Sequence, residues 1–512
     1  MRFGLHSGPV TAGVLRGEKS RFQLFGDTVN TASRMEQTGL KDMIQMSKET
    51  ANLLIQAGKS DWVTERESLV AAKGKGLMKT YWLVIKGSKN KSSDANLSSG
   101  TPSISETASK TEDDSEGMVG RDSERISRLI DWNADVLLRQ LKRIVAMRNV
   151  RAARERASAD MKVDMPRDGK TVLDEVVEVI SLSSKSNDYK QDPEMVQLSS
   201  EVVQQLRDYV AAIAAMYRDN PFHCFEHASH VTQSVTKLLA RVVTPDQIDF
   251  QDLTYKRQGD GELHEFTYGI TSDPIIQFAC AFSALIHDVD HLGVPNATLV
   301  KENSELAQLY NCKSVAEQNS VELAWELLME PTYRELRNCI FTNQDELNRF
   351  RQLVVNSVMA TDICDRELGE LRRKRWEKAF SDEKGLQEES AIVHRNRKAT
   401  IVIEHLIQAS DVAHTMQHWH VYLKWNERFF HECYQAYLKG RSDEDPSGGW
   451  YEGELGFFDF YIIPLAKKLK DCGVFGVASD EYLNYAVANR QEWEAKGKEA
   501  VGGYLSRYQK RD

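Results

Sequence analysis

The sequence predicts a multidomain protein in which a short α/β segment precedes a large all-helical domain. The chain has 512 residues, enough for more than one hydrophobic core. Strand-like and helix-like stretches alternate only near the amino end, whereas from about residue 122 apolar residues recur at helical spacing almost to the carboxyl end. A stretch with almost no large apolar residues separates these regions, which marks a boundary between them.

Residues 1–86 are the predicted α/β segment. RFGLHSGPVTAGVL is strand-like and then punctuated by glycine, TVNTASRMEQTG is typical of a helix that stops at glycine, and TYWLVI is expected to be a closing strand. Residues 87–118 are rich in Ser, Thr, Asp and Gly, and this composition predicts a disordered linker.

Residues 119–199 are predicted to be a helical connector. Ile126, Leu129, Leu137 and Leu141 recur at spacings that give a helix one apolar face. That face would either pack onto the next domain, which we favour, or form a coiled-coil joint. Residues 200–505 are expected to be one all-helical domain, in which the helix VVQQLRDYVAAIAAMY stops near Asn220-Pro221, as a proline requires.

Four residues carry the strongest chemical signal, namely His227, the adjacent His287 and Asp288, and Asp411. His287 and Asp288 follow IIQFACAFSALI, which is apolar all round, and a charge beside such a helix needs pairing or a metal. Each residue alone is more simply a satisfied core polar group or a cap. Together, two imidazoles and two carboxylates suit Zn²⁺, and Asp288 keeps a second oxygen for Mg²⁺ or Mn²⁺.

Such a pair of metal ions favours phosphoester hydrolysis, because the ions activate water and neutralise a phosphate. His223 lies four residues before His227, so on a helix both rings would face one way. From this spacing alone, His223 is as readily a surface histidine before a helix as a general acid that faces a leaving oxygen. His291 follows Asp288 by three residues, a spacing that suits support of the metal ligands.

Residues 200–505 resemble the catalytic domain of class I cyclic-nucleotide phosphodiesterases. The matching stretches, in the family's order and spacing, are HCFEHASHVTQS, ALIHDVDHLGVPN, NSELAQLYN, VMATD, ASDVAH and GELGFFDFYIIPL. The resemblance implies an all-α fold of the HD type and the hydrolysis of 3′,5′-cyclic nucleotides to 5′-monophosphates.

The resemblance also implies roles for individual residues. The ligands of the first metal ion would be His227, His287, Asp288 and Asp411. Asp288 would bridge to the second ion, whose waters would be held by His291, Glu305 and Thr361. His223 would protonate the O3′ leaving group, and Phe429 and Phe457 would clamp the purine ring.

Base recognition departs from the family pattern. The family places Gln two residues before the Gly-Phe of its last motif, where this chain has Glu454. Gln carries a donor and an acceptor and serves either purine, but an ionised Glu only accepts. It could accept from N1–H and the 2-amino group of guanine, so we expect cyclic GMP over, or alongside, cyclic AMP. His414 occupies a position where relatives have Asn or His, and the short, Gly-rich stretch from Arg441 to Glu454 predicts a different lid.

Residues 1–86 resemble the second half of a class III nucleotide cyclase domain, nearest to guanylyl cyclases. The matching stretches are GLHSGPVTAGV, FGDTVNTASRM and KGKGLMKTYWL. The resemblance implies an incomplete ferredoxin-like sheet, with Asn30 and Arg34 at the ribose and the reacting phosphate and Lys75 at the triphosphate. Gln23, at the base-reading position, matches neither the adenylyl nor the guanylyl pattern.

The two metal-binding aspartates of a cyclase belong to its first half, which this sequence lacks, so we expect no cyclase activity from this chain. One interpretation is a truncated start, with a complete cyclase and membrane spans upstream in full-length relatives. The other is a segment kept as a dimerisation or tethering module. A homodimer would then form through the helical connector or the cyclase segment.

The composition indicates which partners are excluded and in which compartment the chain is expected. The net charge of −10 and the lack of a basic, aromatic stripe argue against nucleic acid. The seven cysteines include no CxxC and are expected to be buried thiols of a reducing compartment. No apolar run is long enough to span a membrane, so the chain as given is expected to be cytoplasmic, or the cytosolic part of a membrane protein.

Two other functions are compatible with parts of the sequence. One is an HD-fold phosphohydrolase that acts on a nucleoside triphosphate, which the purine clamp and NSELAQLYN disfavour. The other is a non-catalytic cyclic-nucleotide sensor, which the complete set of metal ligands and His223 disfavours.

Overall fold

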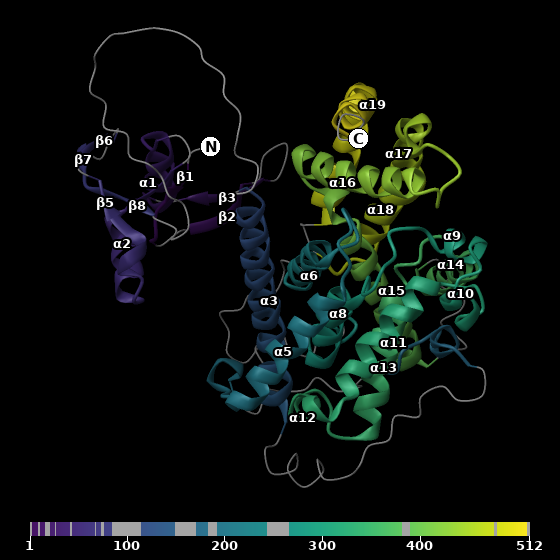
Figure 1. Ribbon diagram of the computed structural model, residues 1–512. Helices are drawn as coiled ribbons and strands as arrows, with labels where there is room; N and C mark the ends of the chain where they lie inside the picture. The colour runs from purple at the N-terminus through teal and green to yellow at the C-terminus, as the bar shows by residue number, and fades with distance from the viewer. Residues whose placement is uncertain are drawn as a thin grey trace. The chain divides into compact units, whose positions relative to one another are not determined.

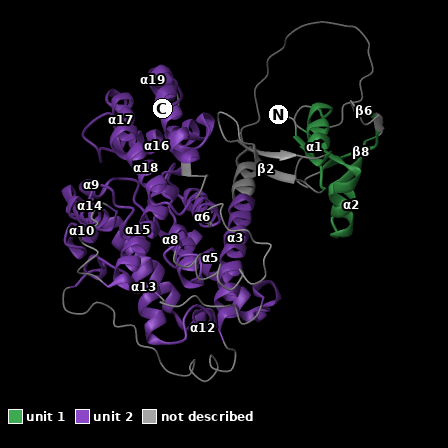
Figure 2. Cartoon of the chain, turned by 180° about the vertical axis from the view of Figure 1, so that it is seen from behind, with its two compact units in different colours: residues 1–109 green, residues 110–512 purple. Residues whose placement is uncertain are grey.

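The computed structural model describes residues 3–8, 11–15, 21–25, 27–40, 43–66, 68–72, 76–83, 114–148, 170–182, 192–242, 266–380, 390–475 and 479–508. The chain divides into two compact units, residues 1–109 and 110–512 (Figure 2). Of the predicted linker, residues 87–113 lie outside the described residues, and residues 114–118 are helical rather than disordered.

Unit 1 is α/β, as predicted. Its main sheet has the order β1 (Phe3–Leu5), β4 (Ile44–Ser47), β8 (Thr80–Leu83) and β5 (Val63–Glu65), with β1 parallel to β4 and the other pairs antiparallel. Two further antiparallel pairs are β2 (Thr11–Leu15) with β3 (Arg21–Phe25), and β6 (Val70–Ala72) with β7 (Gly76–Met78). The helices are α1 (Asp27–Gln37), α2 (Lys48–Gln56) and the short η1 (Ser60–Trp62).

Local chemistry explains how unit 1 packs. Met35 of α1 and Met46 of β4 are both fully buried, so the helix covers this part of the sheet. Gly4 permits the close approach, because a Cβ at this position would lie 2.5 Å from the carbonyl oxygen of Ala32. Ser47 caps α2 by accepting a hydrogen bond from the Thr50 N–H at 3.4 Å.

Unit 2 is all-helical over its described residues, as predicted. Its longer helices are α3 (Asp114–Met147), α5 (Ser200–Met216), α6 (Phe225–Leu239), α8 (Pro274–Ile286), α11 (Val315–Met329), α13 (Gln344–Met359), α14 (Arg366–Phe380), α15 (Ala391–Asp411), α16 (Trp419–Leu438) and α19 (Ser479–Tyr508). Its shorter helices are α9 (Asn296–Lys301), α10 (Glu305–Leu309), α12 (Arg334–Ile340), α17 (Trp450–Phe457) and α18 (Ile463–Asp471). Between them lie η2 (Val172–Glu175), η3 (Pro193–Met195), η4 (Pro331–Tyr333), η6 (Ala413–Met416), η7 (Pro446–Gly448) and the π-helical turn η8 (Phe458–Ile462).

Helix α8 forms the centre of unit 2 and packs against α6, α13 and α3 (Figure 1). Every residue from Pro274 to Ile286 is buried, which agrees with the apolar sequence of this helix. Asp273 caps its amino end by accepting the Ile275 N–H at 3.0 Å, and Pro274 occupies the first helical position. The helix therefore delivers the residues at its carboxyl end into the interior of the unit.

Helix α3, which covers only the first part of the predicted connector (residues 119–147), packs within unit 2 and contacts α5, α6 and α8. Leu137 and Leu141 are fully buried in this contact. The Asn133 side-chain amide donates to Ser229 Oγ at 2.8 Å. The apolar face of α3 therefore packs onto the helices of this unit, which is the favoured of the two expected roles.

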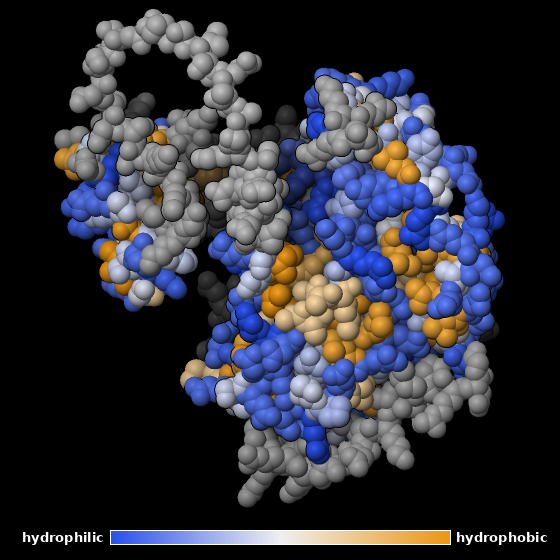
Figure 3. Space-filling model, viewed as in Figure 1, coloured by the Kyte–Doolittle hydropathy of each residue, from blue (hydrophilic) through white to orange (hydrophobic). Residues whose placement is uncertain are grey.

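The remaining features of the structure are the hydropathy of its surface and the state of its cysteines. Hydrophilic side chains predominate on the face seen in Figure 3, and apolar ones gather in separate patches. None of the described helices combines the length and apolar character that a membrane span requires. The seven cysteines are all free, but the expectation that they are buried is wrong for most of them: only Cys280 and Cys472 are buried, and Cys312 and Cys364 are exposed.

Candidate active site

The structure brings the four predicted metal ligands together from three parts of the chain. His227 lies on the buried face of α6, His287 and Asp288 directly follow α8, and Asp411 ends α15. His287 Nε2 lies 3.0 Å from Asp288 Oδ2 and 3.4 Å from Asp411 Oδ1. His227 Nε2 lies 3.0 Å from Asp411 Oδ1 and 3.7 Å from Asp288 Oδ2. All four side chains thus face one point.

The chemistry of this cluster fits a divalent cation. Nδ1 of His287 contacts the carbonyl oxygen of Ala284 at 3.0 Å and must donate its proton there, so in the neutral ring the lone pair lies on Nε2. Nε2 and Asp288 Oδ2 are both buried, and neither has a hydrogen-bond partner within the described part of the chain. Burial raises the pKa of Asp411, but the adjacent His227 and His287 imidazoles outweigh burial and hold that pKa below its usual range. Ionised oxygens and imidazole nitrogens that face one another are a donor set that could hold a divalent cation.

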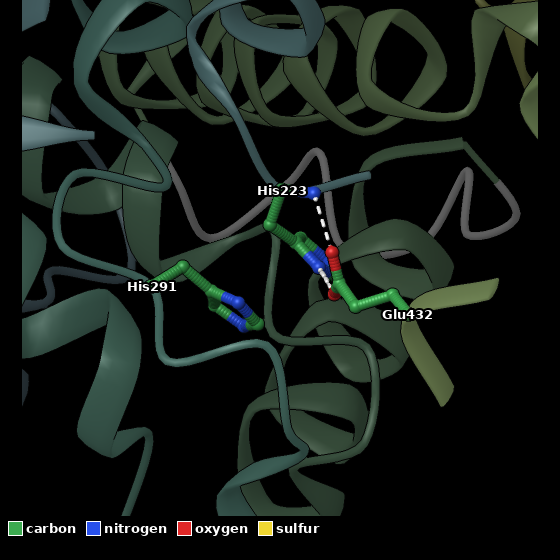
Figure 4. A group of neighbouring side chains, drawn as sticks. All are labelled: His223, His291 and Glu432. Atoms are coloured by element: carbon green, nitrogen blue, oxygen red, sulfur yellow. Dashed lines mark hydrogen bonds and ion pairs between the residues drawn. The ribbon is translucent and has the colours of Figure 1, made fainter. Parts of the chain in front are cut away.

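A second cluster holds His223, the predicted general acid (Figure 4). Glu432 of α16 makes an ion pair with His223 Nδ1 and also accepts the backbone N–H groups of Phe222 and His223, at 2.9 and 3.0 Å. The ring of His291 stacks on the ring of His223, with 3.8 Å between centroids. These contacts fix the His223 ring and leave its Nε2 for another partner.

The electrostatics of this second cluster favour a protonated His223. Burial lowers the pKa of His223, but the carboxylates of Glu432, Asp288 and Asp411 together outweigh burial and raise it to about 9. Burial likewise raises the pKa of Glu432, and the charge of His223 brings it down to about 2. Burial, and then the charge of His223, lower the pKa of His291 to about 4. His223 is therefore the proton carrier of this group near neutral pH.

The sequence analysis missed Glu432. It lies three residues after Phe429, so both fall on one face of α16. That spacing was the only available signal, because Glu432 is more than 200 residues from His223 in the chain. The fold, rather than a local motif, brings them together.

A cavity of about 340 Å³ is lined by all three residues of the second cluster and by Asp411 of the first, whereas His227, His287 and Asp288 do not line it. The residues that line it come from the loop before α6, the segments after α8 and α13, and α9, α11, α15, η6, α16 and α17. The predicted site residues among them are His223, His291, Thr361, Asp411, His414, Phe429, Glu454 and Phe457. Phe429 lies at the rim with 36% of its surface exposed. The cavity is thus acidic and histidine-rich at one part of its wall and aromatic at another.

Glu305, predicted near the second ion, does not line the cavity either. Ser304 caps α10 by accepting the Ala307 N–H at 3.1 Å, and Glu305 is exposed in the first turn. Glu317 of α11 lines the cavity instead and accepts a hydrogen bond from the Asn296 side-chain amide at 2.9 Å. Burial, and then the nearby Asp362, raise the pKa of Glu317 to about 8. The stretch NSELAQLYN thus turns Glu305 to solvent, and the acid that the structure places at the cavity wall is Glu317.

Glu454 is buried at the wall of the cavity. The Tyr422 hydroxyl donates to its Oε2 at 2.6 Å. Burial raises the pKa of Glu454 to about 7, against the lowering effect of hydrogen bonds from Tyr422 and Asn426. Near neutral pH the carboxyl group therefore exists in both forms, and the neutral form offers a donor as well as an acceptor. This differs from the fully ionised Glu454 that the sequence analysis assumed.

His414 also lines the cavity and is buried. Burial is the largest effect that lowers its pKa, to about 3, so the ring is neutral. Its Nδ1 has no hydrogen-bond partner within the described part of the chain. A neutral imidazole with one uncommitted nitrogen can donate to or accept from a bound ligand.

Of the residues assigned to the cyclase segment, Asn30 and Arg34 lie one turn apart on α1. Asn30 is exposed, and Arg34 donates to Gln37 Oε1 at 2.6 Å. Lys75 and the side chain of Gln23 lie outside the described residues.

Comparisons with known proteins match both units. Residues 222–473 match the family described as 3′5′-cyclic nucleotide phosphodiesterase, and residues 1–85 match the adenylate and guanylate cyclase catalytic domain. The chain is 26% identical over 279 residues to the probable 3′,5′-cyclic-AMP phosphodiesterase pde-4 of Caenorhabditis elegans, covering 51% of this chain and 36% of that protein. It is 48% identical over 86 residues to the receptor-type guanylate cyclase gcy-4 of the same organism, covering 17% of this chain and 8% of that protein.

Among solved structures, the chain is similar to the phosphodiesterase domain of the RhoPDE fusion protein of the choanoflagellate Salpingoeca rosetta. The identity is 24% and the TM-score is 0.45, over 59% of this chain and 85% of that one. The chain thus spans about a third of the length of its phosphodiesterase relative and under a tenth of its cyclase relative.

Proposed function

Residues 222–473 form a 3′,5′-cyclic nucleotide phosphodiesterase domain and residues 1–85 a segment of a nucleotide cyclase catalytic domain, and from this premise we propose that the chain hydrolyses 3′,5′-cyclic nucleotides to 5′-monophosphates. One observation supports the proposal above all. Asp411, which belongs to the His/His/Asp/Asp cluster, and His223, which is paired with a carboxylate, line the same cavity. Hydrolysis of a phosphodiester requires both negative-charge neutralisation and a proton for the leaving oxygen.

Two divalent cations are part of the proposal. His227, His287, Asp288 and Asp411 would hold Zn²⁺, and the second oxygen of Asp288 would reach Mg²⁺ or Mn²⁺. We propose Glu317 in the role that the sequence assigned to Glu305, with His291 and Thr361 as its companions around the second ion, because all three line the cavity. Bound ions of this kind neutralise phosphate charge and lower the pKa of water.

His223 is proposed to give the proton that completes the reaction. Its Nδ1 is committed to Glu432, so the proton on Nε2 is the one that can move to O3′ of the departing ribose. Glu432 keeps the ring charged and prevents it from rotating. A positioned acid of this type contributes about 10²–10⁴-fold to a rate.

We propose that both purine cyclic nucleotides are substrates. Phe429 and Phe457 line the cavity and offer aromatic faces to a base. Neutral Glu454 carries a donor and an acceptor and can serve adenine or guanine, as an amide would. Ionised Glu454 favours guanine, which presents two adjacent donors. The preference for cyclic GMP should therefore grow as the pH rises through about 7.

The cyclase segment is proposed to have no cyclase activity in this 512-residue chain, since the family's metal-binding aspartates are not among these residues. For a homodimer we propose contacts through this segment rather than through α3. The apolar face of α3 is already covered, because α3 contacts α5, α6 and α8.

The proposal is tested by incubating the purified chain with cyclic AMP, cyclic GMP and GTP. We expect AMP and GMP from the cyclic substrates and an intact triphosphate. Hydrolysis of GTP alone would favour the other HD-fold phosphohydrolase. Tight binding of cyclic nucleotides without turnover would favour the sensor.

A further inference from the structure

A chain of ion pairs joins α3 to the loop that carries His223. Arg125 of α3 makes an ion pair with Glu226 Oε1, and Arg428 of α16 donates to Glu226 Oε2 at 2.7 Å. Arg428 also donates to the carbonyl oxygen of Pro221 and to Cys224 Sγ, the latter at 3.2 Å. We call this set the Arg125–Glu226–Arg428 relay.

The far end of the relay grips both sides of the proposed acid. Pro221 and Cys224 flank Phe222 and His223, the residues whose backbone N–H groups bind Glu432. Glu226 directly precedes His227 on α6. A shift of Glu226 or Arg428 would therefore reach the backbone of the 221–224 loop without touching a bound substrate.

The two arginines occupy different oxygens of the Glu226 carboxylate. Burial raises the pKa of Glu226, but the charges of Arg428 and then Arg125 outweigh burial and lower it, so the group is ionised. With Arg428 alone, the carboxylate could rotate about one remaining contact and a long 3.8 Å approach from Lys424. Arg125 prevents this rotation because it holds the second oxygen of the Glu226 carboxylate.

We propose that Arg125 is a positioning residue for the phosphodiesterase reaction, acting through Glu226 and Arg428 on the loop that presents His223. The inference rests on the proposed function. Helix α3 is then a working part of the catalytic unit, although it precedes residue 222, where the family match begins. The Arg125 side chain is 48% exposed, so its effect is expected to be modest.

The test uses full-length variants. We expect Arg125→Ala to lower kcat about three- to tenfold with unchanged KM, bound metal and Tm. Arg125→Lys should restore most of kcat, because an ammonium keeps the charge near Glu226. The matched control is Arg128→Ala, one turn along α3, whose side chain is 64% exposed and whose guanidinium lies 3.5 Å from Glu124.

A double variant separates positioning from general damage. If Arg125 acts through Glu226, the loss in Arg125→Ala should not add to the loss in Glu226→Gln. Full additivity of the two losses, or a wild-type kcat in Arg125→Ala, would overturn the inference. A fall in kcat accompanied by loss of metal or of Tm would also overturn it, since that is the signature of a merely structural role.

A second readout does not depend on turnover. Backbone hydrogen exchange of residues 221–226 should be faster in Arg125→Ala than in the wild type and in Arg128→Ala. Unchanged exchange in this segment would refute the relay even if the chain is active. The two proposals can fail separately. If the wild type hydrolyses no cyclic nucleotide but exchange is still faster in Arg125→Ala, the proposed function is refuted and the relay is not.

Discussion

His223 carries the proposed proton transfer, and its side chain can be removed without taking a ligand from the metal cluster. We expect His223→Ala to lower kcat by about 10²–10⁴-fold while the metal content stays that of the wild type. Metal analysis alongside initial rates checks this outcome. If the bound metal is lost together with activity, His223 is a ligand and the assigned role is wrong.

Glu432 sets the protonation of His223, so its charge should appear in the pH profile. In the wild type the rate should fall on the alkaline side of the pH profile, where His223 loses its proton, because Glu432 raises the pKa of His223. Glu432→Gln removes the charge that raises this pKa, so the fall should begin at a lower pH. An unshifted basic limb in Glu432→Gln would mean that another group limits the rate.

Glu454 predicts a pH-dependent choice of nucleotide. Its carboxyl group gains charge as the pH rises through about 7, and the ionised form favours guanine. The ratio of kcat/KM for cyclic GMP over cyclic AMP should therefore rise between pH 6 and pH 8. In Glu454→Gln this ratio should not change with pH, and at pH 8 it should be lower than in the wild type. The same pH slope in both proteins would show that Glu454 does not read the base.

Sequence could predict the residues with a local signature and not those that the fold supplies. The adjacent His287 and Asp288 announce a metal cluster by their position after an apolar helix, and the structure gathers them with His227 and Asp411. Glu432 and Glu317 have no such signature, since each reaches the cavity from a distant helix. The protonation of Glu454 was also beyond the sequence, because it depends on burial.

At the scale of elements, α15 must hold Asp411 in place, and a buried ion pair ties this helix to α14. Arg375 Nη1 lies 2.6 Å from Glu404 Oε1, and their side chains are 0% and 4% exposed. The Asn356 side-chain amide donates to the same oxygen at 3.0 Å. This network links α13, α14 and α15 beneath the site.

Removing one member of that network should be costly. We expect Arg375→Ala to lower the free energy of unfolding by about 3–5 kcal/mol, because it leaves the Glu404 charge buried and unpaired. Denaturant titration checks the value. Adding Glu404→Gln should recover part of the loss. A single Arg375→Ala variant with wild-type stability would show that water reaches Glu404 freely.

Helices with a strong apolar period were predictable, and their partners were not. IIQFACAFSALI (residues 275–286) corresponds to α8, and VVQQLRDYVAAIAAMY (residues 202–217) to α5, because each stretch has a continuous apolar face bounded by a cap or a stop. The periodicity of α3 identified its buried face but left open what covers it. That depends on side chains of α5, α6 and α8, which only the folded chain brings together.

At the scale of the whole molecule, the two units should contribute unequally to activity. We expect the 512-residue chain to form no cyclic GMP or cyclic AMP from GTP or ATP with Mn²⁺, since the cyclase aspartates are not among its residues. Product analysis by chromatography checks this. A cyclic product that disappears in Arg34→Ala would show that unit 1 is a working cyclase.

The metal-assisted hydrolysis of cyclic nucleotides is tested most directly by one paired measurement on Asp411→Ala. Bound metal and the rate of 5′-monophosphate formation are measured together in the wild type, in Asp411→Ala, and in the control Asp480→Ala, whose carboxylate is 56% exposed and pairs with Lys470. We expect the wild type and the control to bind divalent metal and hydrolyse cyclic GMP or cyclic AMP, and Asp411→Ala to lose both properties. Near-normal turnover in Asp411→Ala would contradict the assignment of the site.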